Sequence, residues 1–522
     1  MLKVDNAIIM AAGLSSRFMP LSLEMPKGLL RVKGEILIER QIEMLKEKGI
    51  NDITVVVGYK KEAFYYLKDK YNVKIVVNPC FNTKNNIETL YLVRDSLKNT
   101  YICSSDDYFT ENPFSEYEDD AYYAGEHVDV PTDEWYMIGD RDDNIVRIDK
   151  TGSGGSIMLG HAFYSKKFSD AFVPLIEKAH ESGEYDSVLW EQLLSDNLST
   201  LPKMKIREYP KGVIFEFDTL DELRAFDSKY INDTGSKIMA NIAKVFCVKE
   251  GEITDFHAMT KGLTNSSFVF TLNGKKYVYR HPGEGTEKII SRKHEKVSLE
   301  IAKKYDIDPT FIFMDENEGF KISSYVDGVR TPSYDSFEDS KRVLEVLRRL
   351  HKIDVSVDWT FKPYDDATNM EKLMKENGGI HLDGFETLKK NIEYCYNKTI
   401  GDGVKMCFCH SDTYAPNWMF TDDKTILIDW EYAGEADPGC DLGCYIMDTE
   451  WEVDKAIEFI KEYLKGDSTP SLIFHHLAYT AIVSYYWTVW ALYRESCGAV
   501  LTEELRKWGG MARRYSSYLA NL

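Results

Sequence analysis

The stretch CHSDTYAPNWMFTDDKTILIDWEY (residues 409–432) decides the fold of the C-terminal half of this 522-residue chain. It contains His410, Asp412 and Asn417, and then Asp429 at the end of the strand-like run TILID. Phosphoryl transfer needs an acid that orients a hydroxyl and oxygen ligands that hold Mg²⁺ at the nucleotide phosphates. The stretch therefore predicts that Asp412 and Asn417 are catalytic residues. It also predicts that Asn417 and Asp429 bind Mg²⁺. His410 is expected to brace the loop.

The residues upstream of this loop predict a nucleotide-binding lobe. SSFVFTLNGKKYVYR (266–280) reads as two strands joined by Asn273-Gly274, a strong signal for a two-residue hairpin turn. Arg280 stands where a cation would contact phosphates, and Glu295 on the following helix would pair with it. The expected ATP contacts are Thr264, Asn265, Ser266, Arg280 and Glu295.

The apolar stretch LAYTAIVSYYWTVWALY (477–493) follows the loop. It is short for a membrane span, and Tyr, Thr and Ser interrupt it, so we expect a buried helix and no membrane span. Trp487 and Trp490 are three residues apart and therefore lie on neighbouring positions of one helical face.

The motifs HSDTYAPNW, IDWEYAGEADPGCDLG and SYYWTVWALY match kinase-like phosphotransferases. Residues from about 240 to 522 resemble the bacterial choline kinases of the aminoglycoside-phosphotransferase and choline kinase family, in which an Arg replaces the usual kinase Lys, as Arg280 does here. The resemblance implies that Trp487 and Trp490 wall a trimethylammonium pocket, with Trp508 as a further candidate and Glu431 as the countercharge. The alternative is that both Trp residues of the pair belong to the core.

The first part of the chain predicts a different fold. Apolar, β-branched runs at 7–11, 53–59, 74–78 and 100–107 are typical of buried parallel strands, and 36–50 has the periodicity of an amphipathic helix ending at a Gly. Alternating strands and helices indicate an α/β fold with a doubly wound, Rossmann-like sheet. The second part predicts a two-lobed, protein-kinase-like α+β domain.

AIIMAAGLSSRFMPLSLEMPKGLL (7–30) combines a strand, a turn of small residues and two cations, which suits a bound triphosphate. Residues 1–230 resemble sugar-phosphate nucleotidyltransferases, and among them bacterial CTP:phosphocholine cytidylyltransferases. The resemblance rests on this string and on three later motifs, NPCFNTKNNIETLY, SSDDYF and FEFDTLDEL. The resemblance implies that Lys27 is catalytic. It also implies nucleotide contacts from Ala11, Ala12, Gly13, Ser15, Ser16, Arg17, Lys27 and Asn86. Ser15 departs from the family, which commonly has a second Gly there.

A nucleotidyltransferase also needs a metal ion, because a phosphate attacks the α-phosphorus of another anion. The family pattern places the Mg²⁺ ligands at Asp106 and Asp218. For Asp106 the alternative is a helix-capping or loop acid, and Asp107 is the neighbour with which it is most easily confused. Trp135 matches a position that family members place against trimethylammonium by cation–π contact, and Trp190 is a weaker candidate for that role.

Length predicts two or three domains. The change of pattern at the polar stretch INDTGSK places them at residues 1–232 and 238–522, the second with lobes of about 238–328 and 329–522. A net charge of −21 argues against nucleic acid as a partner. Nine scattered cysteines and a start without a signal-peptide pattern indicate reduced thiols and a cytoplasmic protein. The predicted partners are small molecules, namely choline, phosphocholine, CTP and ATP, and a homo-oligomer is left open.

The two resemblances share one intermediate and together imply a bifunctional enzyme. Choline would be phosphorylated with ATP, and CMP would then be transferred from CTP to phosphocholine. The alternatives are a pathway for ethanolamine or an aminophosphonate, and a sugar kinase coupled to its nucleotidyltransferase. A non-catalytic sensor or scaffold is disfavoured, because Lys27, Asp106 and Asp218 are all present.

Overall fold

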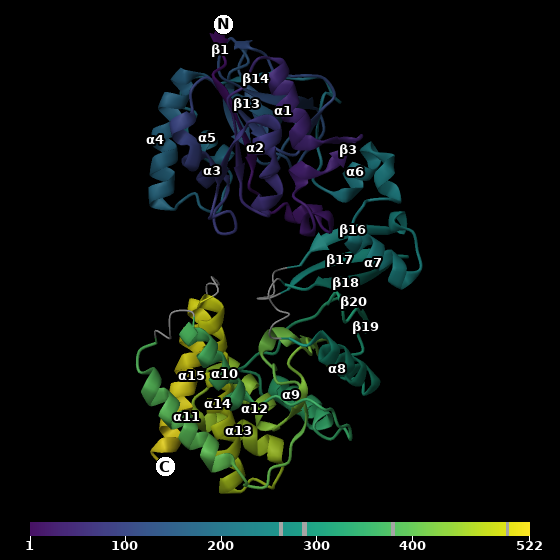
Figure 1. Ribbon diagram of the computed structural model, residues 1–522, viewed down its shortest axis with the longest axis vertical. Coiled ribbons are helices and arrows are strands. Elements are labelled where there is room, and N and C mark those ends of the chain that lie inside the picture. The colour runs from purple at the N-terminus through teal and green to yellow at the C-terminus, as the bar shows by residue number, and fades with distance from the viewer. Residues whose placement is uncertain (260–264, 284–289, 377–381, 497–500) are drawn as a thin grey trace. The chain divides into compact units, whose positions relative to one another are not determined.

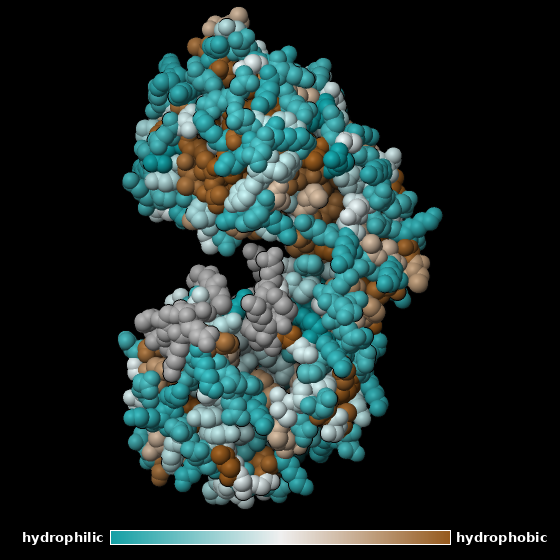
Figure 2. Space-filling model, viewed as in Figure 1, coloured by the Kyte–Doolittle hydropathy of each residue, from teal (hydrophilic) through white to brown (hydrophobic). Residues whose placement is uncertain are grey.

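The computed structural model describes residues 1–259, 265–283, 290–376, 382–496 and 501–522. The chain divides into two compact units, 1–259 with 268–275 and 260–267 with 276–522. Figure 1 shows both units with their helices and strands labelled. On the face drawn in Figure 2, most of the surface of each unit is hydrophilic.

Unit 1 is built on a nine-stranded mixed sheet. Its main path runs β12-β11-β13-β7-β2-β5-β6, and β10 pairs with both β13 and β14. The strands are β2 (Asn6–Ala11), β5 (Ile53–Val57), β6 (Lys74–Val77), β7 (Thr100–Ser104), β10 (Tyr122–Val128), β11 (Tyr136–Gly139), β12 (Ile145–Asp149), β13 (Gly155–Tyr164) and β14 (Lys205–Glu208). The four predicted strands are β2, β5, β6 and β7, and they are parallel as predicted.

Both faces of this sheet are buried, which explains why its strands are continuously apolar. Ile9 on β2 packs in one core with helices α1 (Leu37–Glu47) and α2 (Tyr66–Tyr71). The neighbouring Ile8 packs in the opposite core with α3 (Asn86–Val93), α4 (Lys166–Ser182) and α5 (Trp190–Asn197). Figure 1 shows the two sets of helices on either side of the sheet, which confirms the doubly wound fold.

Unit 1 extends beyond the predicted boundary at 232–238. It includes α6 (Leu220–Phe226), α7 (Lys237–Phe246) and β16 (Ile253–Ala258), which pairs with β17 (Ser266–Leu272). The Glu24 carboxylate accepts hydrogen bonds from the first backbone amides of α7, and the Arg224 guanidinium donates to the carbonyl oxygen of Ile253 at 2.7 Å. These contacts tie the linker region to unit 1, and the predicted domain limits stay a prediction.

Asn273 and Gly274 stand between β17 and β18 (Lys275–His281), and both have positive φ angles, 52° and 73°. A type I′ hairpin turn requires this conformation at both central residues, so the predicted turn is confirmed. Within unit 2, β18 pairs with β20 (Lys321–Ser324), which pairs with β19 (Phe311–Met314), and α8 (Arg292–Lys304) precedes β19 in the chain.

The rest of unit 2 is helical. Its helices are α9 (Phe337–Leu350), α10 (Pro363–Glu376), α11 (Phe385–Thr399), α12 (Gly439–Thr449), α13 (Val453–Leu464), α14 (Pro470–Ser496) and α15 (Thr502–Ala520). The stretch 477–493 lies in α14, which packs against α10, α11, α12, α13 and α15, so the prediction of a buried helix is confirmed. Across the described residues, no helix has the length and apolarity that a membrane crossing requires.

Two short antiparallel strand pairs frame the decisive stretch of sequence. Strand β21 (Cys407–Cys409) pairs with β24 (Gly434–Ala436), and β22 (Trp418–Phe420) pairs with β23 (Thr425–Leu427). Because the two pairs enclose the chain between them, residues 410–417 and 428–433 form loops at neighbouring strand ends. These loops carry the predicted catalytic and metal-binding residues.

Candidate active sites

Unit 1 contains a cleft of about 560 Å³ at the carboxyl ends of β2 and β7. Its lining includes most of the predicted nucleotide and metal residues, namely Ala12, Gly13, Ser15, Ser16, Arg17, Lys27, Asn86, Asp106 and Asp218. Ala11 ends β2 and is buried, and it is not among the lining residues. Ligands of open α/β sheets bind at this end of the strands.

The turn after β2 adopts the conformation that a Gly would favour. Ser15 has a φ of 49° and lies in the left-handed region. An L-residue pays about 1–2 kcal/mol for this conformation, so the departure from the family's usual Gly preserves the shape of the turn at some cost in stability.

The two predicted metal ligands are brought together by a strand pair. Strands β8 (Asp107–Phe109) and β15 (Ile214–Glu216) are antiparallel, with Asp107 opposite Glu216. Asp106 and Asp218 flank this pair and both reach Lys27, whose Nζ lies 2.7 Å from Asp106 Oδ2 and 3.5 Å from Asp218 Oδ1. An ammonium group thus already lies between two carboxylates that could bind a divalent cation.

Lys27 is placed there by close packing. A Cβ at Gly28 would come within 2.8 Å of Ser105 Oγ, so only Gly lets this segment lie against the end of β7. Burial alone would lower the pKa of Lys27, but Asp106 and Glu216 outweigh it and hold the pKa well above its usual value. Lys27 is therefore a permanent cation in the cleft, and Arg17 Nη1 adds a second contact to Asp218 Oδ2 at 2.7 Å.

Asp106, rather than Asp107, faces the cleft. Asp107 is fully buried with both carboxylate oxygens lacking a hydrogen-bond partner among the described residues, and burial raises its pKa well above the usual value. Sequence reasoning missed Glu216, which also lines the cleft. Burial, reinforced by Asp106, raises the pKa of Glu216 to about 8. Its signal was the motif FEFDTLDEL, which contains Glu216 two residues before Asp218.

The two Trp residues predicted for unit 1 have different surroundings. Trp190 is 1% exposed and packs among Tyr123, Tyr164 and Phe172 in the core, so the structure does not place its ring in the cleft. Its predicted contact with a head group is not supported by this position, because aromatic neighbours cover the ring. Trp135 is half-buried, and the Lys150 ammonium lies 5.0 Å from its ring centroid, although Trp135 does not line the cleft.

Unit 2 contains a second cavity, of about 130 Å³. Eight predicted residues line it, namely Asn265, Arg280, Asp412, Asp429, Glu431, Trp487, Trp490 and Trp508. Ser267, Tyr414, Tyr432 and Met447 line it as well and were not predicted. Ser266 is exposed and outside the lining, and Thr264 lies outside the described residues.

The catalytic loop is held by buried hydrogen bonds. Asn417 Nδ2 donates to the backbone oxygen of Asp412 at 2.8 Å and to its Oδ2 at 3.0 Å. Burial, followed by the nearby charges of Asp429 and Glu431, raises the pKa of Asp412 well above its usual value. His410 Nε2 lies 2.9 Å from the backbone oxygen of Ile428, which agrees with the predicted bracing role.

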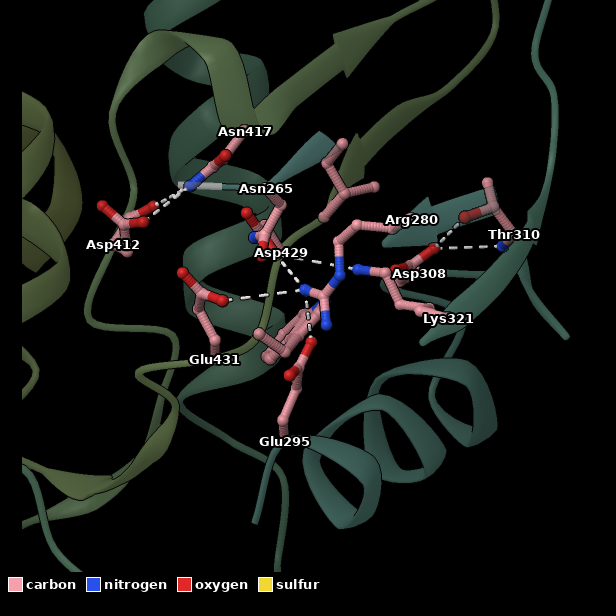
Figure 3. Close-up of polar contacts among 12 residues, drawn as sticks. Asn265, Arg280, Glu295, Asp308, Thr310, Lys321, Asp412, Asn417, Asp429 and Glu431 are labelled. Carbon is pink, nitrogen blue, oxygen red and sulfur yellow. Dashed lines mark hydrogen bonds and ion pairs between the residues drawn. The ribbon is translucent and has the colours of Figure 1, made fainter. Parts of the chain in front are cut away.

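Figure 3 shows Arg280 at the centre of a cluster of acids. Its Nη1 lies 2.6 Å from Glu295, 3.1 Å from Asp429 and 3.7 Å from Glu431. Burial disfavours the charged form of Arg280, but Glu295 and Asp429 outweigh it and raise its pKa. The predicted pair of Arg280 and Glu295 therefore exists, although Glu295 lies behind Arg280 and does not line the cavity.

Two further cations support this cluster and were not predicted. Arg292 Nη1 lies 2.9 Å from Glu295 and 3.4 Å from Glu431, and Lys321 Nζ lies 3.7 Å from Asp429. Lys321 and Arg280 outweigh the burial of Asp429 and lower its pKa, which keeps this carboxylate ionised and fit to bind a metal ion. Arg292 lies in the same helical segment as Glu295, SRKHEKVSLEIA (291–302), but no motif distinguished it from the other cations there.

An aromatic cage closes the other side of the cavity. The ring of Trp487 lies 5.5 Å from Trp490, 5.8 Å from Trp508 and 5.1 Å from Tyr432. Glu431 lines the same cavity, and burial followed by repulsion from Asp429 raises its pKa to about 7. The cavity therefore combines the predicted catalytic acid Asp412, the predicted metal-binding acid Asp429 and several aromatic faces within one small volume.

These two sites define a nucleotidyltransferase joined to a kinase-like phosphotransferase. The family model for choline/ethanolamine kinase matches residues 256–500, and the model for the MobA-like NTP transferase domain matches residues 7–102. The choline-phosphate cytidylyltransferase of Streptococcus pneumoniae is 36% identical over 228 residues, which are 44% of this chain and 99% of that protein. The chain therefore belongs to the choline-phosphate cytidylyltransferase family through its N-terminal domain, and a choline kinase domain follows.

Two other proteins are each similar to about half of the chain. The 2-aminoethylphosphonate cytidylyltransferase of Lancefieldella rimae is 34% identical over 230 residues, covering 43% of this chain and 93% of that protein. The crystal structure of choline kinase LicA from Streptococcus pneumoniae has a TM-score of 0.47 and 22% identity, and covers 55% of this chain and 98% of its own.

Proposed function

We propose that this chain makes CDP-choline from choline in two steps. The second unit transfers the γ-phosphoryl group of ATP to choline, and the first unit transfers CMP from CTP to the resulting phosphocholine and releases pyrophosphate. The observation that carries the proposal is the cage of Trp487, Trp490, Trp508 and Tyr432 beside Asp412. A quaternary ammonium cannot donate hydrogen bonds, so aromatic faces and a carboxylate are the groups that recognise it.

In the kinase step, the Trp faces and Glu431 hold the trimethylammonium group, which leaves the hydroxyl of choline toward Asp412. The Asp412 carboxylate accepts the hydrogen bond of that hydroxyl and orients its oxygen for attack, while Asn417 fixes the carboxylate. Arg280 offsets phosphate charge. Asn417 and Asp429 present the oxygen ligands that Mg²⁺ requires, and Mg²⁺ when bound would neutralise the charge of the ATP phosphates.

In the cytidylyl step, no side chain needs to act as nucleophile, because the substrate phosphate is one. Lys27 and Arg17 offset the charge of the triphosphate and of the leaving pyrophosphate. The carboxylates of Asp106 and Asp218 converge on a cation already and so fit Mg²⁺, which when bound would bring the two anionic reactants together. Trp135 remains the candidate for the head group of phosphocholine.

The second candidate function uses a primary amine, because the aminoethylphosphonate enzyme is nearly as similar in sequence as the choline-phosphate enzyme. A primary ammonium donates three hydrogen bonds and would be expected to meet several acceptors. The cavity of unit 2 offers Glu431 with three Trp rings instead, which favours choline. Comparing kcat/KM for choline and ethanolamine measures the preference directly.

We place both reactions in the cytoplasm. ATP, CTP and Mg²⁺ are available there, and every cysteine within the described ranges is a free thiol. Free thiols persist in a reducing compartment.

The test uses the full chain with choline, ATP, CTP and Mg²⁺, and follows products by mass spectrometry. The native chain should form CDP-choline. Asp412→Asn should form none from choline but should still convert added phosphocholine, whereas Asp218→Asn should stop at phosphocholine. If Asp412→Asn still phosphorylated choline at the native rate, the assignment of the kinase site would be wrong.

A further inference from the structure

A cluster of two thiols and one imidazole lies behind the catalytic loop, outside both active sites. Cys407 and Cys409 lie two apart on β21 and therefore project from the same face of the strand. Their Sγ atoms are 3.6 Å apart. His351, which follows α9, completes the cluster, and the ligand atoms of all three residues lie within 4.8 Å of one another.

We propose that Cys407, Cys409 and His351 bind one thiophilic divalent cation of the Zn²⁺ class, and that this cation weakens the support of the catalytic loop. Zn–S bonds of about 2.3 Å in a tetrahedral site place two sulfurs about 3.8 Å apart. The observed separation of 3.6 Å is close to that value, so the strand already holds both thiols at the required spacing.

The imidazole of His351 has the orientation that metal-binding histidines show. Its Nε2 lies 2.9 Å from Asp441 Oδ2, and its Nδ1 lies 2.7 Å from the Tyr463 hydroxyl. A carboxylate on one ring nitrogen fixes the other as the ligand, which assigns Nδ1 to the cation.

The two thiols differ in exposure. Cys407 is half-buried, whereas Cys409 is fully buried and its thiol donates to the backbone oxygen of Ala436. A cation would therefore reach Cys407 first. Full binding releases both thiol protons and any proton on Nδ1, so affinity should rise with pH.

The site is linked to catalysis through Asp441. The carboxylate of Asp441 accepts hydrogen bonds from the backbone amides of His410 and Ser411, at 3.1 and 2.6 Å. Ser411 has a φ of 69°, a conformation that persists only where the surroundings hold it. His351 Nε2 contacts the same Asp441 Oδ2 atom that accepts from the His410 amide, so the imidazole, Asp441 and the loop form one chain of contacts.

Cation binding would draw on the ring that contacts Asp441. The three ligand atoms lie within 4.8 Å of one another, and ligation of one cation needs them closer, so the imidazole would move toward the sulfurs. That movement would loosen its contact with Asp441, and the loop that carries Asp412 would be held less firmly. This consequence rests on the proposed kinase function, but binding of the cation does not.

The experiment titrates the reduced full chain with Cd²⁺, whose thiolate complexes absorb in the ultraviolet, in a phosphine reductant that keeps disulfides open. One equivalent should bind with a thiolate band that is lost in Cys407→Ser and in Cys409→Ser. Cys247→Ser, which removes an exposed thiol in unit 1, should keep the band. His351→Gln should raise the dissociation constant. Absence of the band, or its persistence in Cys407→Ser, would overturn the site, and an unchanged dissociation constant in His351→Gln would remove the imidazole from it.

The kinase readout is separate. Saturating Zn²⁺ should lower the rate of choline phosphorylation in the native chain and in Cys247→Ser, but much less in Cys407→Ser. The difference between the two variants would exclude inhibition by Zn²⁺ bound at Asp429 or Glu431. A native chain that binds Cd²⁺ at Cys407 yet keeps its full kinase rate with Zn²⁺ would overturn the link to the loop. A chain that binds Cd²⁺ at Cys407 but phosphorylates no amino alcohol would leave the site intact and refute the proposed kinase.

Discussion

Replacing Trp487 by Leu should remove much of the recognition of choline while sparing ATP. Trp487 is the central ring of the cage, within 5.8 Å of Trp490, Trp508 and Tyr432. A desolvated cation–π contact contributes about 2 kcal/mol, which corresponds to a loss of about 30-fold in kcat/KM for choline. Leu keeps apolar bulk in the core, so the change mainly removes the aromatic face.

The assay measures initial rates of phosphorylation against choline and against ATP. The KM for ATP should stay near its native value, and conversion of added phosphocholine by unit 1 should be unchanged. Trp451→Leu is the matched control, because Trp451 is buried in the same core but does not line the cavity. Thermal unfolding of both variants separates loss of fold from loss of recognition. If Trp451→Leu lost as much kcat/KM as Trp487→Leu, the cage argument would be refuted.

The other predictions concern the front cleft, the acid cluster and the loop. Lys27→Met should reduce cytidylyl transfer by two or more orders of magnitude, since it removes a buried cation from the triphosphate; a native rate of CDP-choline formation from phosphocholine would contradict this. Glu222→Ala should lower the same activity several-fold with the kinase rate unchanged, because Glu222 Oε2 accepts from the backbone amide of Asp218 at 2.7 Å. Glu295→Ala should cost about 3 kcal/mol in the free energy of unfolding, because Arg280 and Arg292 lose a partner that is 0% exposed; denaturant titration measures it. The His351→Gln variant should have a lower free energy of unfolding than the native chain at low pH, and this difference should shrink as pH rises. The pKa of His351 is raised in the folded state, so its contribution is complete below about pH 6.5 and is lost as pH climbs through the folded value; a gap that widened with pH would reverse the argument.

Much of the fold could be predicted from local sequence. The four apolar runs in unit 1 are parallel strands because both faces of the sheet are covered, and a strand in that environment must be apolar throughout. The strands β10 to β14, of which all but β14 pair antiparallel, were not predicted, because they lie where the chain has no such continuous runs. The turn at Asn273-Gly274 needed only the backbone preferences of two residues.

The site residues divide in the same way. Asp412, Asn417 and Asp429 come from one continuous stretch, so their spacing alone was enough to predict them. Arg292 and Lys321 were missed because an ordinary surface cation looks the same in sequence as a cation that contacts Glu431 or Asp429. Trp190 is the reverse case, since an aromatic residue near a site can equally fill the core.

The motifs were enough to predict two folds, two nucleotide sites and the chemistry of each, because these depend on backbone turns and on residues close together in the chain. Tertiary structure alone brought Asp218 to Asp106 through the β8–β15 pair, placed Tyr432 in the Trp cage and gathered His351 behind Cys407 and Cys409. Those contacts join segments far apart in sequence, and only the packing of strands and helices decides which distant side chains meet. The stretch 409–432 predicts a phosphotransferase, whereas the packing of α14 and α15 beside it forms the pocket that we propose for choline.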